Sequence, residues 1–329
     1  MTLLLGVDGG ATKTVALVAD ETGAVRGAGR SGSSDIHNEV SPDVAVDHVI
    51  ASVREALAAA GASLPEVEVG VFGLCGADWP EDVAFYSQAL RARLPLQIEP
   101  VVTNDAFNTL RAGTPDGLGV ALVMGTGAAI AARGPTGRTW FSGERMERAG
   151  AMEFGRQVYD LLLRGEYGLG PRPGFEAEAL KAFAADSVES MVYAITRTGG
   201  LGHRSLGRLA PVLLEASHTG DPQAHGIVLD AARSVSGYLH RAAQRVHLAP
   251  DNAVVVLAGG LFRHPGTDLR DAIAAALPRY RLQSTRLEPA YGGLPAPRVL
   301  VVLLSAQPCL IGFLEVPDEV LLVGLGVVN

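Results

Sequence analysis

The chain has 329 residues, 48% of them hydrophobic and 19% charged, and a formal net charge of −8 at pH 7. This length and apolar content predict a globular protein with two domains and exclude a disordered chain. The negative charge argues against nucleic acid as a main partner, because a phosphate backbone is bound by a basic surface. The two cysteines, Cys75 and Cys309, lie far apart, which excludes a disulfide framework and favours a cytoplasmic protein.

The sequence predicts no membrane-spanning segment. The amino terminus predicts a strand and not a signal peptide. Residues 299–314 are apolar and uncharged, but Ser305, Gln307 and Pro308 interrupt them, and the run is short for a bilayer span. We therefore expect no membrane partner.

The first part of the chain alternates strand patterns with helix patterns. The predicted strands are residues 3–8, 15–19, 24–29, 67–71 and 98–103. Ser41 and Pro42 predict the start of a helix that Gly61 ends, and a second helix is predicted over residues 80–94. This alternation predicts an α/β sheet covered by helices.

The strand–turn–strand pattern of the amino terminus begins again near residue 118. Strands are predicted over residues 118–124, 128–133, 138–142 and 253–257. Residues 150–247 are mainly helical in pattern, and Asp221 with Pro222 predicts the start of a long helix through Val246. We interpret the repeat as a duplication of architecture, with domains at 1–115 and 116–329 that join near residues 113–117.

Two glycine turns follow predicted strands and indicate phosphate binding. The first is Asp8-Gly9-Gly10-Ala11-Thr12-Lys13-Thr14, and the second is Gly125-Thr126-Gly127. Glycines let backbone N–H groups approach an anion, and hydroxyls add donors. The Asp8 carboxylate is a candidate ligand for hydrated Mg²⁺. The first turn is no P-loop, because Thr12 stands where that motif requires glycine.

Five motifs in a fixed order carry a resemblance to a known family. They are the Asp8 turn, Gly73-Leu74-Cys75-Gly76-Ala77-Asp78, Thr103-Asn104-Asp105-Ala106, Met124-Gly125-Thr126-Gly127 and Leu257-Ala258-Gly259-Gly260. The set resembles the actin-like ATPase superfamily and, more narrowly, the N-acetylglucosamine kinase and BadF-type ATPase family. The resemblance implies two actin-like (ribonuclease H-like) domains with a nucleotide cleft between them, the use of ATP and Mg²⁺, and a homodimer.

The resemblance also implies roles for individual residues. Asp8 would organise the metal, and Asp105 would accept the proton of a sugar hydroxyl. The phosphates would be lined by Gly10, Thr12, Lys13, Thr14, Gly125, Thr126 and Gly127. The adenosine would lie against Gly259 and Gly260. The sugar would contact Ser34, Asp35, His37, Asn38, Asn104 and Glu153.

The residues alone leave simpler roles open. Asp8 could be a solvated turn residue, and the loop of Ser34–Asn38 could be a solvated loop. Asp105 could cap the helix that follows it, a role compatible with catalysis. The phosphoryl-transfer chemistry nevertheless needs positioning, neutralised charge and an oriented nucleophile, and a carboxylate at a strand end supplies the last of these.

The chain departs from the family pattern at three places. Ala128 replaces a serine after the second turn, residues 150–155 keep only Glu153 of an acidic turn, and residues 295–329 leave the pattern. We expect an ATP-dependent kinase of an amino sugar or N-acetylated hexose, a small-molecule partner. One alternative is a non-catalytic sugar sensor of the same fold. The other is an activator of a 2-hydroxyacyl-CoA dehydratase, which would need cysteine thiolates for an iron–sulfur cluster.

Overall fold

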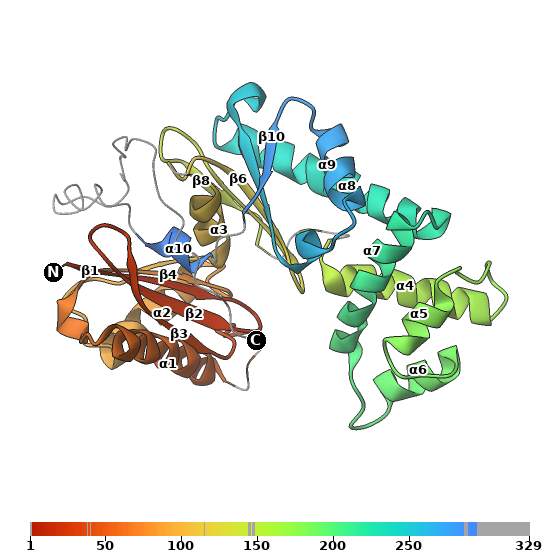
Figure 1. Ribbon diagram of the computed structural model, residues 1–329, viewed down its shortest axis with the longest axis horizontal. Helices are drawn as coiled ribbons and strands as arrows, with labels where there is room; N and C mark the ends of the chain where they lie inside the picture. Colours follow the sequence, from red (N-terminus) through yellow and green to blue (C-terminus); the bar gives the residue numbers. More distant parts are fainter. Residues whose placement is uncertain are drawn as a thin grey trace.

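The computed structural model describes residues 2–37, 39, 41–114, 116–143, 146, 149–285 and 289–294, and all structural statements below concern these residues. They form two five-stranded sheets, each covered by helices, and a helical lobe beside the second sheet (Figure 1). The predicted position Asn38 and the atypical segment 295–329 lie outside the described residues.

The first sheet has the strand order β3-β2-β1-β4-β5. Its strands are β1 (Leu3–Gly9), β2 (Thr14–Asp20), β3 (Val25–Ser31), β4 (Val67–Leu74) and β5 (Val101–Thr103). β1, β2 and β3 form an antiparallel meander, and β4 and β5 continue the sheet in parallel. Every residue of β1 is buried, which explains its unbroken apolar run.

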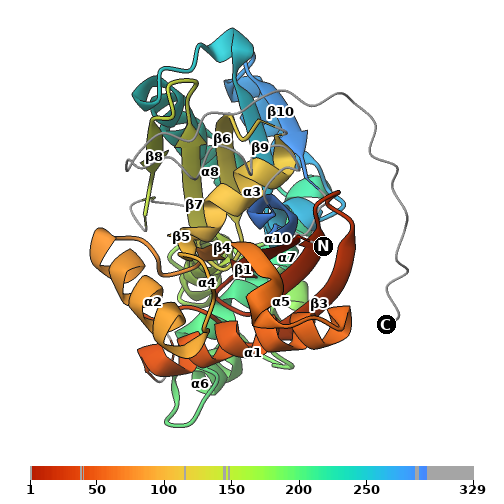
Figure 2. The same ribbon diagram turned by 90° about the vertical axis from the view of Figure 1, so that its left-hand side faces the viewer.

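Helices cover both faces of this sheet. α1 (Pro42–Ala60) and α2 (Pro80–Arg93) lie on one face, and α3 (Asp105–Gly113) follows β5 (Figures 1 and 2). The short 3-10 turn η1 (Leu64–Glu66) leads into β4. α1 ends as predicted at Gly61, whose φ of 64° is left-handed.

The second sheet repeats the topology of the first. Its order is β10-β9-β6-β7-β8, with β6 (Gly119–Met124), β7 (Ala128–Arg133), β8 (Thr139–Phe141), β9 (Val254–Ala258) and β10 (Arg281–Ser284). β6 and β7 pair antiparallel, while β6, β9 and β10 are parallel. Counted from its own first strand, each sheet therefore has the order 3-2-1-4-5, and the predicted duplication is confirmed.

The connection between β8 and β9 is helical, as the sequence predicts. It contains α4 (Ala151–Glu166), α5 (Glu176–Lys181), α6 (Val188–Thr196), η2 (His203–Leu209), α7 (Ala210–His218), α8 (Pro222–Arg245) and η3 (Pro250–Asn252). The Asp221 carboxylate caps α8 by accepting from the N–H groups of Gln223 and Ala224, both at 3.0 Å. η4 (Gly260–Arg263) and α9 (Asp268–Ala276) follow β9.

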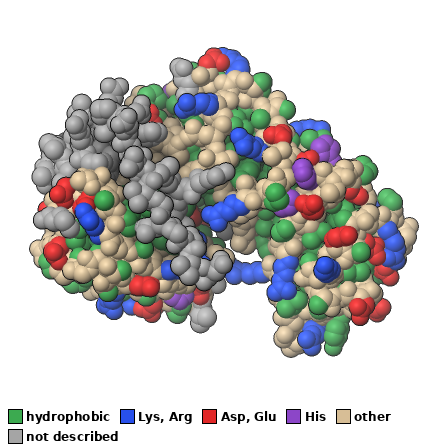
Figure 3. All heavy atoms as spheres, in the orientation of Figure 1, with side chains coloured by type: hydrophobic (Ala, Val, Ile, Leu, Met, Phe, Trp, Pro, Cys, Tyr) green, Lys and Arg blue, Asp and Glu red, His purple; other side chains and the backbone are tan. Residues whose placement is uncertain are grey.

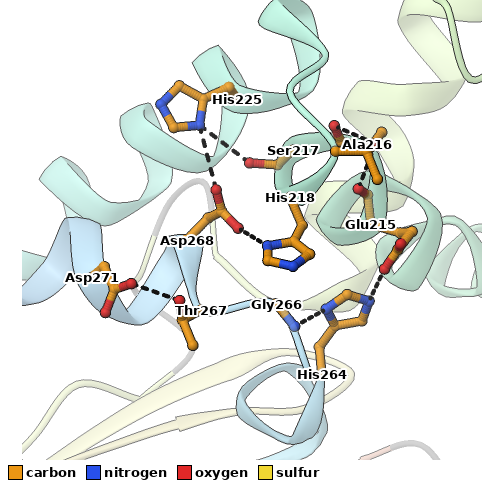
Figure 4. Close-up of polar contacts among 11 residues, drawn as sticks. Glu215, Ala216, Ser217, His218, His225, His264, Gly266, Thr267, Asp268 and Asp271 are labelled. Atoms are coloured by element: carbon orange, nitrogen blue, oxygen red, sulfur yellow. Dashed lines mark hydrogen bonds and ion pairs between the residues drawn. The ribbon is translucent and has the colours of Figure 1, made fainter.

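Histidine–carboxylate contacts join three helices of the second domain (Figure 4). His218 Nδ1 on α7 lies 3.1 Å from Asp268 Oδ2 on α9, and His225 Nδ1 on α8 lies 3.8 Å from the other oxygen of Asp268. His264 Nε2 lies 3.5 Å from Glu215 Oε2. These contacts lie near the protein surface, so the buried apolar side chains of α7 and α8 contribute more to holding the helices together.

The described chain returns at its end to the first domain. α10 (Ala290–Gly293) packs against β1 and α3, and the shared cluster includes Leu4, Leu17 and Ala290. The contact is close, since a Cβ atom on Gly292 would lie 1.8 Å from the carbonyl oxygen of Asn108. A division at residue 115 falls between α3 and β6, but it separates α10 from the sheet on which it packs.

Among the described residues we find no helix both long enough and apolar enough to cross a bilayer. The apolar segment 299–314 lies outside these residues.

Candidate active site

A cavity of about 130 Å³ lies between the two sheets and is lined from both domains. The first domain contributes Asp8, Lys13, Asp105 and Thr109, and the second contributes Gly259, Phe262 and Arg263 among others. Figure 3 shows a hollow between the N-terminal domain and the helical lobe. The residues predicted for metal, phosphate, base and adenosine roles are thus represented in one place.

Asp8 lies at the end of β1 and is 9% exposed. Asn108 Nδ2 on α3 approaches its Oδ1 at 3.4 Å, and the same amide donates to the carbonyl oxygen of Val7 at 2.8 Å. The described residues hold no group of three or more side chains arranged to ligate a metal. A metal here would therefore take one or two carboxylates from the protein and its other ligands from phosphate and water, an arrangement typical of Mg²⁺.

The first glycine turn presents Lys13 to the cavity and turns Thr14 inward. Thr12 is exposed beside Lys13, while Thr14 is fully buried. Thr14 Oγ1 donates to the carbonyl oxygen of Gly32 at 2.8 Å, and the Gly10 N–H donates to the Lys13 carbonyl at 2.8 Å. In this conformation Thr14 stabilises the junction of β2 and β3, and Lys13 and Thr12 remain on the open side of the turn.

Asp105 is the first residue of α3 and is half-buried. Asn104 precedes it as the N-cap, with Oδ1 accepting from the Ala106 N–H at 3.0 Å. Burial raises the pKa of Asp105 to about 7, and the charge of the Asp78 carboxylate raises this pKa more than the charge of Asp35 does. A carboxyl group with a pKa near neutrality is well matched to general-base catalysis.

The predicted sugar loop follows β3 and is held against the first turn. Ser34 is fully buried, its N–H donates to the Gly10 carbonyl at 3.1 Å, and its Oγ finds no partner among the described residues. Asp35 is 5% exposed and accepts from the His37 N–H at 3.0 Å. His37 is exposed, with Nε2 3.4 Å from Asp82 Oδ2. Ser34 therefore packs beneath the loop, and the charge of Asp35 contributes to the raised pKa of Asp105.

The second glycine turn is hydrogen-bonded to the start of α4. The carbonyl oxygens of Gly125 and Thr126 accept from the N–H groups of Ala151 and Met152 at 2.9 and 3.0 Å. Gly150 must be glycine, because its φ is 96° and a Cβ atom would lie 2.6 Å from the Gly127 backbone. By contrast, Cβ atoms on Gly125 or Gly127 would meet no atom within 4 Å. The turn does not line the cavity described above.

Glu153 belongs to the first turn of α4 and is engaged by its own helix. Its carboxylate accepts from Arg156 Nη2 at 2.8 Å and Nε at 3.0 Å, and from Gln157 Nε2 at 3.0 Å. Such contacts orient the carboxylate along the helix surface. Glu153 is not among the residues that line the cavity.

Gly259 follows β9 and lies against the end of β6. Its φ is 101°, and a Cβ atom would lie 2.3 Å from the Met124 carbonyl oxygen. Only glycine fits such a position. Gly260 begins η4 with open space at its Cβ position. Phe262 and Arg263 of η4 line the cavity next to Gly259.

Sequence reasoning missed several residues that line or adjoin this site. Phe262 and Arg263 follow directly after the predicted Gly259-Gly260 motif, so their place in the chain could have indicated them. Asp78 closes the second family motif, and it contacts Asn104, since Asn104 Nδ2 donates to Asp78 Oδ1 at 2.8 Å. Thr109 lies one helical turn after Asp105, on the same side of α3.

Comparison with known proteins supports the motif-based resemblance. Residues 5–141 match the BadF/BadG/BcrA/BcrD ATPase family. The chain is 24% identical over 309 residues to an N-acetyl-D-glucosamine kinase of Dictyostelium discoideum, covering 88% of this chain and 96% of the relative. It is 24% identical over 302 residues to an N-acetylmuramic acid/N-acetylglucosamine kinase of Clostridium acetobutylicum, covering 89% and 97%. The family resemblance is confirmed.

Solved structures similar to the chain extend this likeness to the fold. A protein of Chromobacterium violaceum described as a candidate N-acetylglucosamine kinase has a TM-score of 0.68 at 23% identity, covering 91% of this chain and 99% of that one. A ROK family glucokinase from Streptomyces griseus, solved with glucose and AMPPNP, has a TM-score of 0.58 at 18% identity, covering 88% and 96%. These likenesses confirm the predicted class, an α/β protein of two actin-like domains.

Proposed function

We propose that this protein is an ATP-dependent kinase that phosphorylates a hydroxyl group of an amino sugar or N-acetylated hexose. The observation that carries the proposal is the cavity in which Asp8, Lys13 and Asp105 of one domain meet Gly259 of the other. Phosphoryl transfer requires such a meeting of phosphate ligands with an oriented acceptor. On the family resemblance, we extend the proposal to a cytoplasmic homodimer.

In the proposed reaction Asp105 accepts the proton of the sugar hydroxyl. As that O–H bond breaks, the oxygen bonds to the γ-phosphorus, the bond from phosphorus to the β-phosphate oxygen breaks, and ADP leaves. Because the pKa of Asp105 is raised to about 7, the carboxylate is both available and basic at neutral pH.

Charge neutralisation would come from both domains. Lys13 and Arg263 line the cavity, so two cations can face the phosphates from opposite sides. The Asp8 carboxylate fits Mg²⁺, since hard cations prefer oxygen ligands. When bound, Mg²⁺ would neutralise charge on the β- and γ-phosphates. Asp8 itself would be held in place by β1 and by the Asn108 amide.

The glycines of the second turn support a phosphate contact. Neither Gly125 nor Gly127 is required by neighbouring protein atoms, since each Cβ position is open. A bound anion that approaches the backbone N–H groups closely would explain why side chains are missing there. Thr126 is exposed between them and adds a hydroxyl donor. Closure of the two domains would bring this turn to the cavity.

The acceptor class rests on the two curated relatives, whose names specify N-acetylglucosamine and N-acetylmuramic acid as substrates. Asp78 and Asn104 carry oxygen and nitrogen atoms beside Asp105, which suits recognition of hydroxyl groups. Two observations favour the alternative, a sugar sensor without catalysis. Ala128 lacks a hydroxyl group, and the Glu153 carboxylate accepts a hydrogen bond from Arg156.

The test is ATP consumption measured against a panel of N-acetylated and free amino sugars, with glucose and no sugar as controls. The proposal expects ADP release that depends on an N-acetylated or amino sugar. Tight binding of such a sugar with no ADP release would favour the sensor. ADP release that does not depend on sugar would contradict the proposal that the protein is a sugar kinase.

A further inference from the structure

Asp78 lies on the connection from β4 to α2, outside the set of residues predicted for the site. Its Oδ1 accepts a hydrogen bond from Asn104 Nδ2 at 2.8 Å. The other end of the same amide, Oδ1, accepts from the Ala106 N–H at 3.0 Å and so caps α3. Because Asp105 stands between Asn104 and Ala106, Asp78 is one hydrogen bond from the backbone that carries the proposed base.

The segment that carries Asp78 is itself fixed at both ends. The Cys75 N–H donates to the Gly9 carbonyl at 2.6 Å, which joins the segment to the strand that carries Asp8. At the other end, the N–H groups of Asp78 and Trp79 donate to Asp82 Oδ2 at 3.2 and 2.9 Å. Asp78 can therefore transmit the position of β1 and α2 to the start of α3.

We propose that Asp78 is a positioning residue of the transfer reaction, which acts on the proposed base through Asn104 and through its own charge. This inference rests on the proposed function, because it assigns Asp105 as the group on which Asp78 acts. Asn104, expected to contact the sugar, here uses its side-chain oxygen and one side-chain hydrogen to join Asp78 to α3. One amide hydrogen of Asn104 remains for an acceptor oxygen.

The charge of Asp78 has a consequence that can be measured. Of the neighbouring charges, Asp78 contributes most to raising the pKa of Asp105, and Asp35 contributes less. Asp8, Lys13 and Arg263 face the same cavity as Asp105. Asp82 accepts from the Asp78 N–H, and His37 lies beside Asp82. Removal of the Asp78 charge should therefore make Asp105 release its proton at lower pH.

The test compares Asp78→Asn with Asp78→Ala and with Glu81→Gln as a matched control. Glu81 is exposed on the first turn of α2, so its substitution removes an equal charge without touching Asn104. In Asp78→Asn we expect the acidic limb of the kcat profile to move to lower pH by about half to one unit. In Asp78→Ala we expect the same shift and a kcat lowered about tenfold or more, because the start of α3 is no longer held. The KM for ATP should change little.

A second measurement reads the same effect without turnover. Carbon NMR of ¹³C-labelled protein follows the Asp105 carboxyl directly, with Asp105→Asn used to assign its signal. We expect the titration midpoint to fall in both Asp78 variants and to stay unchanged in Glu81→Gln. An Asp105 midpoint that is the same in wild type and in folded Asp78→Asn would overturn the inference. If the wild type is inactive but the Asp105 midpoint still falls in the Asp78 variants, the proposed function is overturned. The influence of Asp78 on Asp105 is then established all the same.

Discussion

The side-chain amide of Asn108, on α3, donates to the carbonyl oxygen of Val7, on β1, at 2.8 Å. Val7 precedes Asp8, and Asn108 lies one helical turn after Asp105. The bond therefore joins the strand that ends in the proposed metal ligand to the helix that begins with the proposed base. It also explains Gly73 on β4, where a Cβ atom would lie 2.3 Å from Asn108 Nδ2.

We predict that Asn108→Ala weakens both stability and catalysis. The free energy of unfolding should fall by about 1–3 kcal/mol, because the buried carbonyl of Val7 loses a hydrogen-bond partner. The kcat should fall by about tenfold or more, because Asp8 and Asp105 lose their common support. Urea unfolding and steady-state kinetics measure the two effects. A variant as stable and as active as wild type would show that the bond has no such role.

The raised pKa of Asp105 predicts a pH-dependent stability. In the folded protein this group binds a proton up to a pH of about 7, whereas in the unfolded chain it releases the proton near the ordinary aspartate value. Stability from this group is therefore lost as the pH rises from about 4 to 7. Asp105→Asn removes the charge that the folded protein disfavours and should raise Tm at pH 8 by at least about 1.5 °C, the shift that ~1 kcal/mol gives in a chain of 329 residues.

The same variant should lose its advantage in acid. At pH 4 the folded wild type holds a neutral carboxyl group, which resembles the asparagine side chain, so the two Tm values should converge. Calorimetry at pH 4, 6 and 8 makes the comparison. A Tm difference that does not depend on pH would argue against a raised pKa at Asp105.

Two glycine substitutions should separate ligand contact from folding. Gly127→Ala adds a methyl group in open space, so we expect stability within about 0.5 kcal/mol of wild type. Its affinity for ATP should nevertheless fall about tenfold or more. The methyl group would hold the phosphate away from the backbone N–H groups of the turn, and a hydrogen bond to a charged group contributes ~1.5–3 kcal/mol.

Gly259→Ala serves as the contrasting variant. Gly259 has a φ of 101°, and a Cβ atom there would lie 2.3 Å from the Met124 carbonyl oxygen, so there is no room for a methyl group. We expect a loss of more than about 1 kcal/mol in stability. Thermal unfolding and ATP titration of both variants test the pair. Unchanged ATP affinity in Gly127→Ala would remove the second turn from the phosphate site.

Asp8→Asn should weaken the metal-dependent binding of nucleotide and leave sugar binding intact. The carboxamide keeps the shape of the side chain but loses the charge that favours Mg²⁺. Calorimetry of ATP binding with and without Mg²⁺, followed by calorimetry of sugar binding without nucleotide, gives both quantities. Loss of sugar affinity in the absence of nucleotide would contradict the metal role.

The sequence predicted the architecture well because its signals are local. Apolar runs, hairpin turns and the Asp221-Pro222 helix start indicate strands and helices whatever the tertiary context. The repeat at residue 118 was visible for the same reason. The packing of α10 on α3 was not, because the contact of Gly292 with Asn108 joins segments far apart in the chain.

The site was predicted in part, and the limit was side-chain direction. Asp8, Lys13, Asp105 and Gly259 line the cavity as the motifs indicated. Thr14 has the right residue type, but its position on β2 turns the hydroxyl toward Gly32. The contact between Asn104 and Asp78 was not predicted, although both residues belong to the motifs. Their hydrogen bond depends on the parallel pairing of β4 and β5, which no single motif contains.

Formation of a phosphosugar by wild type and by Asp105→Asn is the most direct test of the central claim. Each protein is incubated with ATP, Mg²⁺ and N-acetylglucosamine, and the products are identified by mass spectrometry with ADP measured in parallel. We predict one phosphosugar for each ADP in wild type, and a rate lowered ~10²–10⁴-fold in Asp105→Asn with its fold intact. An Asp105→Asn variant that keeps more than about a tenth of the wild-type rate would contradict the account, because a positioned base contributes far more than that.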